Sequence, residues 1–494
     1  MKRLVALVCL VAASGILAAQ PGDADFVDEF SGKPRLVVLT DIGNEPDDQM
    51  SMVRLLLYSN ELDIEGLVAT TSTWQRERVR PDMIAKVVGA YGEVQPNLLK
   101  HAKGWPAAKD LRAMISAGQP GFGMAAVGPD RLSDGANALL AAAHSDDPRP
   151  LWITVWGGAN TLAQALLTER ATHTREELAA TVSKLRVYSI SDQDDAGPWI
   201  RREFPTLYYI VRPSQPNSYE YLYATWTGIS GDVFYRNCEG ADGSLVTNEW
   251  LDRNIRSKGV LGRAYPRFEY IMEGDTPSFL NLIGNGLEAY RNPGWGGWGG
   301  RYLSYMPAGE TRAIWTQGGD ADTRITSRDE VMGVDGKLHV SDQATVWRWR
   351  EAFQNDFAAR MDWTVQERAQ ANHAPSVILD RDAKTWPISL HVRVGDTVEL
   401  SAANSSDPDG DALRYRWFQY AEAGYAPRRG VAALEILEPN AAKTRIRAAA
   451  ACRPAWKNSN ADCESGVAHV ILAVTDDGTP SLTTYRRIII AVAR

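Results

Sequence analysis

The sequence predicts an α/β fold, built on a mostly parallel sheet with flanking helices and followed by an Ig-like β-sandwich. Strand-like and helix-like runs alternate over the first half of the chain, which is the pattern of a sheet covered by helices on both faces. Short alternating runs separated by turn signals fill the C-terminal region, as in small β-sandwiches. The chain has 494 residues, of which 44% are hydrophobic, and this is enough for two such cores.

The expected elements follow one another at short intervals. Apolar runs predict buried strands at residues 35–40, 64–70, 150–156, 184–190 and 206–211. Apolar residues at helical spacing predict helices at 47–60, 81–92, 134–145, 160–169 and 343–363. A change in composition at 364–377 predicts a linker, and further strands are expected at 391–402, 413–420, 469–478 and 485–493. We therefore expect an α/β domain at residues 33–365 and a β-sandwich domain at 374–494.

The N-terminal segment predicts export. Lys2 and Arg3 precede an apolar run and then small residues, which is the pattern of a secretory signal peptide, here residues 1–19. The alternative is a membrane anchor, but the run is short for a span, and no later segment is apolar enough to cross a bilayer. We expect a secreted or periplasmic protein in which Cys452 and Cys463 form a disulfide.

The composition argues against several classes of function. The formal net charge is −8 and no basic block occurs, so nucleic acid is not an expected partner. The seven histidines show no metal-ligand spacing, which predicts no zinc site. Neither a glycine-rich phosphate loop nor a nucleophilic serine elbow is evident in the sequence.

The end of the first predicted strand carries an unusual concentration of acidic side chains. Five acidic or amide residues lie within the eight positions 41–48 of LTDIGNEPDDQMS, and they are Asp41, Asn44, Glu45, Asp47 and Asp48. Ligands bind beyond the carboxyl ends of the strands in parallel sheets, and a cation there would explain why like charges are brought together. The alternative is that Asp47 and Asp48 only cap the first turn of a helix.

Three further stretches carry a resemblance to a known family. The acidic junction, VWGGANTLAQAL at residues 155–166 and EGDTPSFL at residues 273–280 together resemble the nucleoside-hydrolase superfamily. The stretch ISDQDDAGPWIRREFP, at residues 190–205, is typical of its exported branch, the cellulose-binding, nucleoside-hydrolase-like proteins. The resemblance covers roughly residues 33–365, and the β-like tail is similar to the C-terminal domain of that branch.

The resemblance implies a Ca²⁺ site and a role for each matching residue. Asp41 matches the aspartate that binds calcium and orients or deprotonates water. Asp47 and Asp48 match an adjacent pair of calcium ligands, and Asp275 matches the last ligand. Trp156, just before the glycines of WGGAN, would supply a carbonyl ligand.

The departures from the family pattern concern the specificity groups. This chain has Gly274 where nucleoside hydrolases commonly have a histidine near the leaving base. It has two additional residues between Asp41 and the Asp47–Asp48 pair, and the ribose-binding asparagine is not evident in VATTSTWQRE. The sequence therefore predicts a carbohydrate rather than a nucleoside as the substrate.

A glycosidase also needs an acid for its leaving group. The candidates are Asp192, Asp194, Asp195, Glu203 and Glu273. SDQDDAGPW is favoured because it follows a predicted strand at its carboxyl end, and Asp195 is our choice within it; the alternative is a polar turn before a short helix.

Other side chains are candidates for holding the substrate. They are Asn160, Trp74, Trp199, Asp192 and Glu273. Indole rings stack well on sugars, and Trp295 and Trp298 are further candidates, with packing under a glycine-rich loop as the alternative. In the tail, Asp407, Asp409 and Asp411 lie at alternate positions, which indicates a tight turn or, alternatively, a second calcium site.

Taken together, these features predict a secreted, calcium-dependent hydrolase of glycosidic bonds that acts on a cell-wall or plant carbohydrate. One alternative is an N-ribohydrolase acting on nucleosides. Another is a non-catalytic protein that binds cellulose or another polysaccharide.

Overall fold

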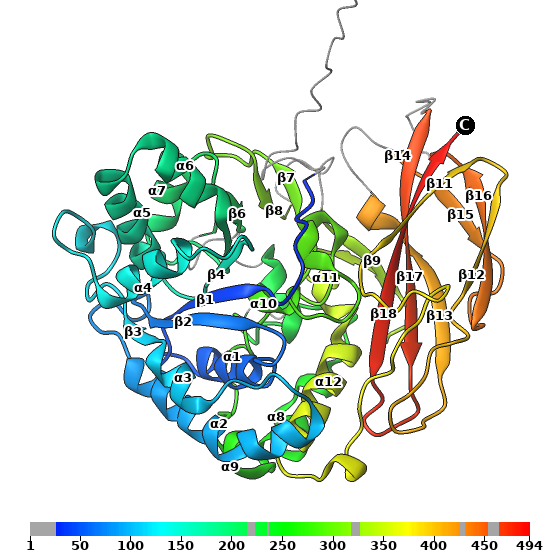
Figure 1. The fold of residues 1–494 in the computed structure, drawn as a ribbon, viewed down its shortest axis with the longest axis horizontal. Helices are drawn as coiled ribbons and strands as arrows, with labels where there is room; N and C mark the ends of the chain where they lie inside the picture. Colours follow the sequence, from blue (N-terminus) through cyan, green and yellow to red (C-terminus); the bar gives the residue numbers. More distant parts are fainter. Residues whose placement is uncertain (1–25, 215–222, 235–236, 318–326, 425–429, 453–463) are drawn as a thin grey trace, which may run out of the picture.

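The computed structural model describes residues 26–214, 223–234, 237–317, 327–424, 430–452 and 464–494, which form an α/β part and a β-rich part (Figure 1). The α/β part contains an eight-stranded sheet in the order β3-β2-β1-β4-β5-β6-β8-β7, parallel except that β7 is antiparallel to β8. Its strands are β1 (Arg35–Thr40), β2 (Asp63–Ala69), β3 (Ile115–Ala117), β4 (Leu151–Val155), β5 (Leu185–Ser189), β6 (Tyr208–Ile210), β7 (Leu303–Tyr305) and β8 (Ile314–Thr316). The fold class predicted from the sequence is confirmed.

Helices cover both faces of this sheet (Figure 1). Leu36 and Val38 of β1 pack in one core with residues of α1 and α2, while Val37 and Leu39 pack on the opposite face with residues of α4 and α5. Burial on both faces explains why β1 is apolar throughout its middle. The helices of this part are α1 (Asp47–Leu56), α2 (Pro81–His101), α3 (Ala108–Ala113), α4 (Asp134–Ala143), α5 (Asn160–Thr172), α6 (Arg175–Lys184), α7 (Ala196–Glu203), α8 (Asn248–Leu251), α9 (Gly259–Arg263), α10 (Pro277–Leu280), α11 (Ala344–Trp347) and α12 (Arg350–Asp362).

The single helix predicted over residues 343–363 is wrong. The chain leaves helical geometry at Trp349, which separates α11 from α12. The Trp349 ring packs at 5.5 Å from Tyr485 and 5.8 Å from Tyr420, and Arg348 pairs with Asp329 at 2.7 Å. These tertiary contacts override the local helical pattern. A hairpin of β9 (Asp329–Met332) and β10 (Leu338–Ser341) precedes the break.

The β-rich part consists of two sheets that enclose one core. One sheet has the order β11-β18-β17-β13, with β14 also paired to β17, and the other has the order β12-β16-β15. Inner residues of both sheets, among them Leu400, Trp417, Ile446 and Ile490, belong to the same buried cluster, as in a β-sandwich. The strands are β11 (Ile388–Arg393), β12 (Thr397–Ser401), β13 (Arg414–Tyr420), β14 (Gly430–Val431), β15 (Ala433–Ile436), β16 (Lys443–Ala450), β17 (Ser465–Thr475) and β18 (Thr483–Ala493).

The two parts are joined by buried polar contacts. Arg487 of β18 donates hydrogen bonds to the carbonyls of Leu287 and Gly296, each at 2.7 Å. The Tyr420 hydroxyl donates to Asp329 at 2.6 Å, and the Tyr485 amide donates to the Asn285 carbonyl at 2.9 Å. Arg487 is fully buried, so the β-sandwich is docked on the α/β part.

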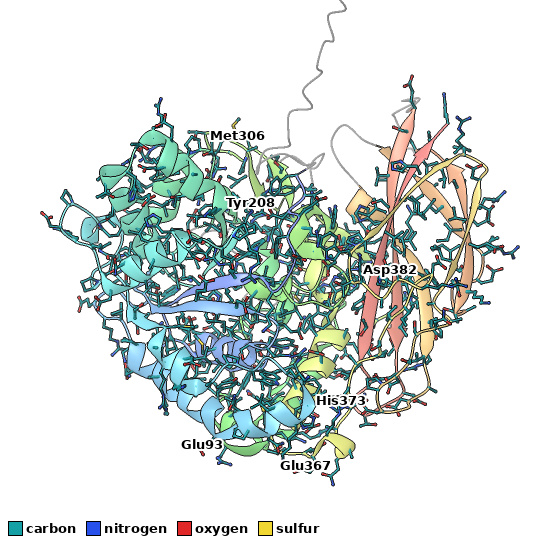
Figure 2. All side chains as sticks on the ribbon, viewed as in Figure 1. Glu93, Tyr208, Met306, Glu367, His373 and Asp382 are labelled. Carbon is teal, nitrogen blue, oxygen red and sulfur yellow. The ribbon has the colours of Figure 1, made fainter. Side chains whose placement is uncertain are left out.

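The predicted linker is also held in place. His373, labelled in Figure 2, lies 3.1 Å from His101 of α2 through their ring nitrogens, and its amide donates to Asp409 at 2.7 Å. Asp407 accepts hydrogen bonds from the amides of Asp409 and Asp411, so these contacts are those of a tight turn. A second calcium site there stays a prediction.

Two further expectations concern export. Residues 1–19 lie outside the described residues, as does Cys463; Cys452 is disulfide-bonded. Among the described residues, no helix combines the length and apolar character needed to span a bilayer.

Candidate functional site

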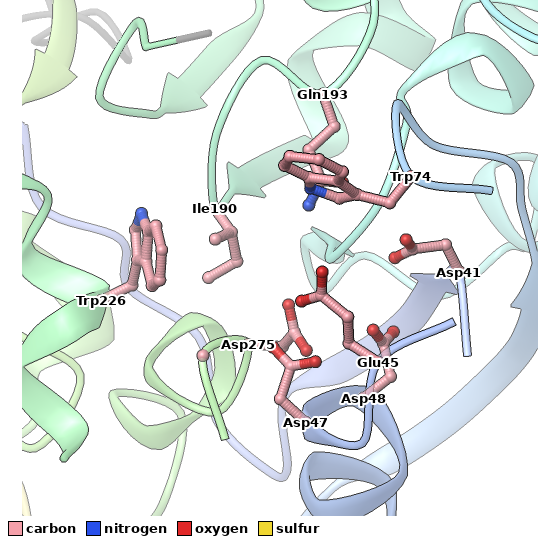
Figure 3. A pocket seen from close by; sticks show the side chains of 10 residues that line it. Asp41, Glu45, Asp47, Asp48, Trp74, Ile190, Gln193, Trp226 and Asp275 are labelled. Atoms are coloured by element: carbon pink, nitrogen blue, oxygen red, sulfur yellow. The ribbon is translucent and has the colours of Figure 1, made fainter. Parts of the chain in front are cut away.

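An acidic pocket lies at the carboxyl edge of the central strands (Figure 3). Loops after β1, β2 and β5 contribute to it, together with the segment before α10. Its lining residues are Asp41, Glu45, Asp47, Asp48, Trp74, Ile190, Gln193, Trp226, Gly274 and Asp275. We refer to this site as the acidic pocket.

The first acidic residues of the pocket follow from the local sequence. Asp41 directly follows β1, and Asp47 and Asp48 form the first turn of α1, where the partial positive charge of the helix N-terminus favours carboxylates. The Thr40 hydroxyl donates to Asp48 and accepts a hydrogen bond from the Ile42 amide at 3.1 Å. Thr40 thereby fixes the strand-to-helix turn.

The fold brings a distant carboxylate to this turn. Asp47, Asp48 and Asp275 each offer an oxygen atom, and these oxygens lie within 4.8 Å of one another. Asp41 lies outside this close group but still lines the pocket. A Cβ built on Gly157 would lie only 2.6 Å from Asp41 Oδ1, so a glycine is needed at 157 for the chain to pass Asp41.

Two buried oxygens of this cluster have no hydrogen-bond donor. They are Asp41 Oδ1 and Asp275 Oδ2. Both side chains are buried, with 5% and 3% of their surface exposed, and no lysine or arginine among the described residues pairs with either of them. A buried carboxylate oxygen without a donor or counter-charge is costly, and a cation bound in this cluster would offset the negative charge. The residues present therefore fit a divalent ion.

Burial and mutual repulsion perturb the titration of the cluster. Burial raises the pKa of Asp47 to about 8, with the charges of Glu45 and Asp41 adding to the effect. Burial and neighbouring charges also raise the pKa of Asp48 and of Asp275 well above the ordinary value for aspartate. Burial, followed by the charge of Asp41, raises the pKa of Glu45 to about 7.

Two acidic residues predicted to bind substrate instead form ion pairs outside the acidic pocket. Glu273 is fully buried, and its oxygens accept hydrogen bonds from Arg54, from Tyr265 at 2.6 Å and from Thr276 at 2.8 Å. Asp192 forms a two-point ion pair with Arg201 at 2.8 and 2.9 Å. Neither side chain lines the acidic pocket, because each one neutralises a buried arginine.

The remaining predicted polar residues also lie outside the lining. Asp195 is exposed and accepts a hydrogen bond from the Met124 amide at 2.7 Å. Asn160 is fully buried at the start of α5, and its amide nitrogen donates to the Gly121 carbonyl at 2.7 Å. The structure therefore does not bring Asp195 or Asn160 to the acidic pocket, and their roles remain predictions.

Of the tryptophans predicted to stack on a sugar, one lines the acidic pocket and others pack elsewhere in the fold. Trp74 lines the pocket and is 42% exposed. Trp199 packs on Phe204 at 5.8 Å instead, Trp298 is buried, and Trp295 packs on His469 of the β-sandwich at 5.8 Å. The Trp156 carbonyl accepts a hydrogen bond from Gln193 at 2.6 Å, and Trp156 is not among the residues that line the pocket. Calcium ligation by Trp156 stays a prediction.

The sequence patterns give no role to several lining residues. Glu45 lies within the acidic junction, but the family resemblance implies roles for Asp41, Asp47 and Asp48 and none for Glu45. Gln193 lies between the candidate acids Asp192 and Asp194. Trp226 comes from the irregular region after β6, where no periodicity pointed to a site.

Comparison with known proteins places the acidic pocket within a family. A family model described as "Cellulose-binding Sde182, nucleoside hydrolase-like domain" matches residues 35–302, more than half of the chain. The chain belongs to this family. A second model of the Sde182 group, described as "Cellulose-binding protein Sde0182, C-terminal domain", matches residues 397–492. All lining residues of the acidic pocket fall within the nucleoside hydrolase-like match.

A solved structure similar to this Sde182-family chain is that of a nucleoside hydrolase-related hypothetical protein from Saccharophagus degradans that is associated with carbohydrate metabolism. It is 33% identical, has a TM-score of 0.75 and covers 93% of this chain and 100% of that one. The effector protein XOO4466 is 13% identical with a TM-score of 0.30, covering 69% of this chain and 95% of its own. No match was found among curated proteins.

Proposed function

We propose that this protein is a secreted, calcium-dependent hydrolase of glycosidic bonds that acts on a carbohydrate. The observation that carries the proposal is the acidic pocket, in which buried oxygens of Asp41 and Asp275 have no donor and no basic partner among the described residues. Fold stability alone gives no reason to bury carboxylates in this way. Family membership in a nucleoside hydrolase-like group supports a hydrolytic role.

Asp47, Asp48 and Asp275 are the proposed calcium ligands, because their oxygens converge within 4.8 Å. Calcium prefers six to eight oxygen ligands, and carboxylates are the usual protein donors. When bound, the ion would polarise water and hold sugar hydroxyls in place. The three carboxylates come from α1 and from the segment before α10, so both segments must keep their positions for the site to form.

Asp41 is the proposed general base. It adjoins the close group of three carboxylates without belonging to it, and its Oδ1 has no donor. A free carboxylate oxygen is able to accept the proton of an attacking water. Attack at an anomeric carbon by that water is a single displacement with inversion, which needs no nucleophilic side chain.

Glu45 is the proposed acid for the leaving group. It is the one lining carboxyl group of the pocket that is neither the proposed base nor a proposed ligand. It is half-buried, whereas Asp195 is exposed and outside the lining. We therefore assign proton donation to Glu45 in place of Asp195.

A sugar is the proposed occupant of the remaining space. Trp74 and Trp226 lie on different sides of the pocket (Figure 3), and indole faces stack on sugar rings. Gly274 offers no side chain to protonate a leaving base, and a Cβ at that position would already lie 3.0 Å from Asp47. The carbohydrate association of the similar Saccharophagus degradans protein supports the same choice.

The test is a screen of the mature protein on oligosaccharides of plant and microbial cell walls, with calcium or with chelator. We expect release of reducing ends that chelator stops, that is lost in Asp41→Asn and that persists in Asp195→Asn. Release of free base from inosine or uridine would instead identify an N-ribohydrolase. Binding to cellulose without any hydrolysis, unchanged in Asp41→Asn, would identify a non-catalytic binding protein.

A further inference from the structure

A second group of potential metal ligands lies apart from the acidic pocket. His144 caps the C-terminal end of α4, while Glu169 and His173 lie at the C-terminal end of α5. The three residues each offer one ligand atom, all within 4.8 Å of one another. We call this group the His–Glu–His cluster.

The distances within the cluster suit a single ion. Glu169 Oε2 lies 2.9 Å from His144 Nε2 and 3.1 Å from His173 Nδ1. Nitrogen and oxygen ligands bind zinc at about 2.0–2.2 Å, which places neighbouring ligand atoms roughly 3–3.5 Å apart. The cluster therefore needs only a small expansion to hold an ion between the two imidazoles and the carboxylate.

The surroundings hold the carboxylate and leave the imidazoles accessible. The Glu169 side chain is 1% exposed, and Thr181 of α6 donates to its other oxygen at 2.7 Å. The two imidazoles are 39% and 34% exposed, so water is able to complete the coordination. Among the described residues, no arginine or lysine pairs with Glu169. An oriented carboxylate next to two accessible histidines is a frequent zinc-ligand set.

The cluster is independent of the proposed calcium site. Helix α5 begins at Asn160, beside the carboxyl edge of the sheet, and runs for 13 residues to Thr172. At 1.5 Å per residue this places its C-terminal end about 20 Å away from its start. The hard oxygen donors of the acidic pocket favour calcium, whereas imidazoles favour zinc and related transition metals.

We propose that the His–Glu–His cluster binds one zinc-class transition-metal ion. The ion ties the C-terminal ends of α4 and α5 together, and Thr181 connects them to α6. Without the ion, Glu169 accepts hydrogen bonds from both histidines, so the fold does not depend on the metal. The site adds stability at an edge of the sheet that takes no part in substrate binding.

The test is titration of the full mature protein with Zn²⁺ after removal of bound metal, in the presence of saturating Ca²⁺ so that the acidic pocket is filled. We expect one Zn²⁺ per chain, a rise in melting temperature, and a visible absorption band when Co²⁺ replaces Zn²⁺. His144→Ala and His173→Ala should lose this binding, and Thr181→Val should weaken it about tenfold. His391→Ala removes an exposed histidine of β11 and serves as the matched control.

Both histidines are partly exposed, so their alanine variants should fold, which circular dichroism checks directly. If the His144→Ala and His173→Ala proteins are folded and bind Zn²⁺ as the unaltered protein does, the proposal is wrong. It is also wrong if the calcium-saturated protein binds no Zn²⁺, since the cluster is then only a hydrogen-bonded contact.

Discussion

Two groups of carboxylates in this molecule differ in whether a basic side chain pairs with them. Glu273 and Asp192 are each paired with an arginine, Arg54 and Arg201 respectively. The carboxylates of the acidic pocket have no such partner among the described residues, and Asp275 is only two residues from Glu273. The same fold thus pairs these two acids with internal arginines and leaves the pocket acids without such a partner, as the proposed cation site requires. Perturbed, unpaired groups in a cleft are typical of functional sites.

The largest expected effect is on activity. Asp41→Asn should lower kcat by about 10²–10⁴-fold because the variant cannot accept the proton of water. The rate of reducing-end release on the substrate found by screening measures this loss. Asp195→Asn should stay within a few-fold of the unaltered rate, and equal losses in both variants would remove the distinction that we draw between them.

The next effect compares two substitutions in one loop. Glu273→Gln should destabilise the fold by about 3–5 kcal/mol, because it leaves the Arg54 charge buried without a counter-charge. Asp275→Asn should not destabilise the chelated protein, since it relieves repulsion. Urea unfolding in chelator measures both free energies. A large loss in Asp275→Asn would mean that this carboxylate has an internal partner.

Calcium should stabilise the fold through the acidic pocket. At a concentration 100 times its dissociation constant, a ligand of the folded state adds about 2.7 kcal/mol. Melting temperature as a function of Ca²⁺ concentration measures the effect, and Asp275→Asn should abolish most of it. Stabilisation that is equal in this variant would place the calcium elsewhere.

The pH dependence of the chelated protein follows from the raised pKa of Asp47, about 8 when folded against an ordinary value of 3.8. Asp47 binds its proton more tightly in the folded state than in the unfolded state, so protonation of Asp47 stabilises the fold. This stabilisation is complete below the ordinary pKa of 3.8 and is lost as the pH rises through 8. We expect the melting temperature in chelator to fall by a few degrees more between pH 5 and pH 8 than it does in Asp47→Asn. A parallel pH profile in the variant would contradict this assignment.

The smallest effect concerns sugar stacking. Trp74→Ala should raise KM by roughly 2- to 10-fold, because an aromatic contact contributes about 0.5–1.5 kcal/mol. Trp199→Ala removes a tryptophan outside the pocket and serves as the control. Steady-state kinetics distinguish the two, and an unchanged KM in Trp74→Ala would exclude stacking on that ring.

Local sequence signals predicted the parallel sheet and part of the candidate site. Asp41, Asp47 and Asp48 were identified because strand, turn and helix follow one another directly, and Asp275 only because its motif resembles a family. The pairing of Glu273 with Arg54 joins residues 219 positions apart, and no local pattern reports such a contact. The same reason hid Trp226 and the meeting of His144 with His173, since tertiary packing alone brings them to their neighbours.

The buried hydrogen bonds from Arg487 to the carbonyls of Leu287 and Gly296 restrict how the β-sandwich can move relative to the α/β part. These contacts hold the β-sandwich against the α/β part, so the two would approach a solid substrate in a fixed relative orientation. Deleting the β-sandwich would expose the surfaces of Trp295 and Trp349 that pack against it, so the truncated protein should aggregate.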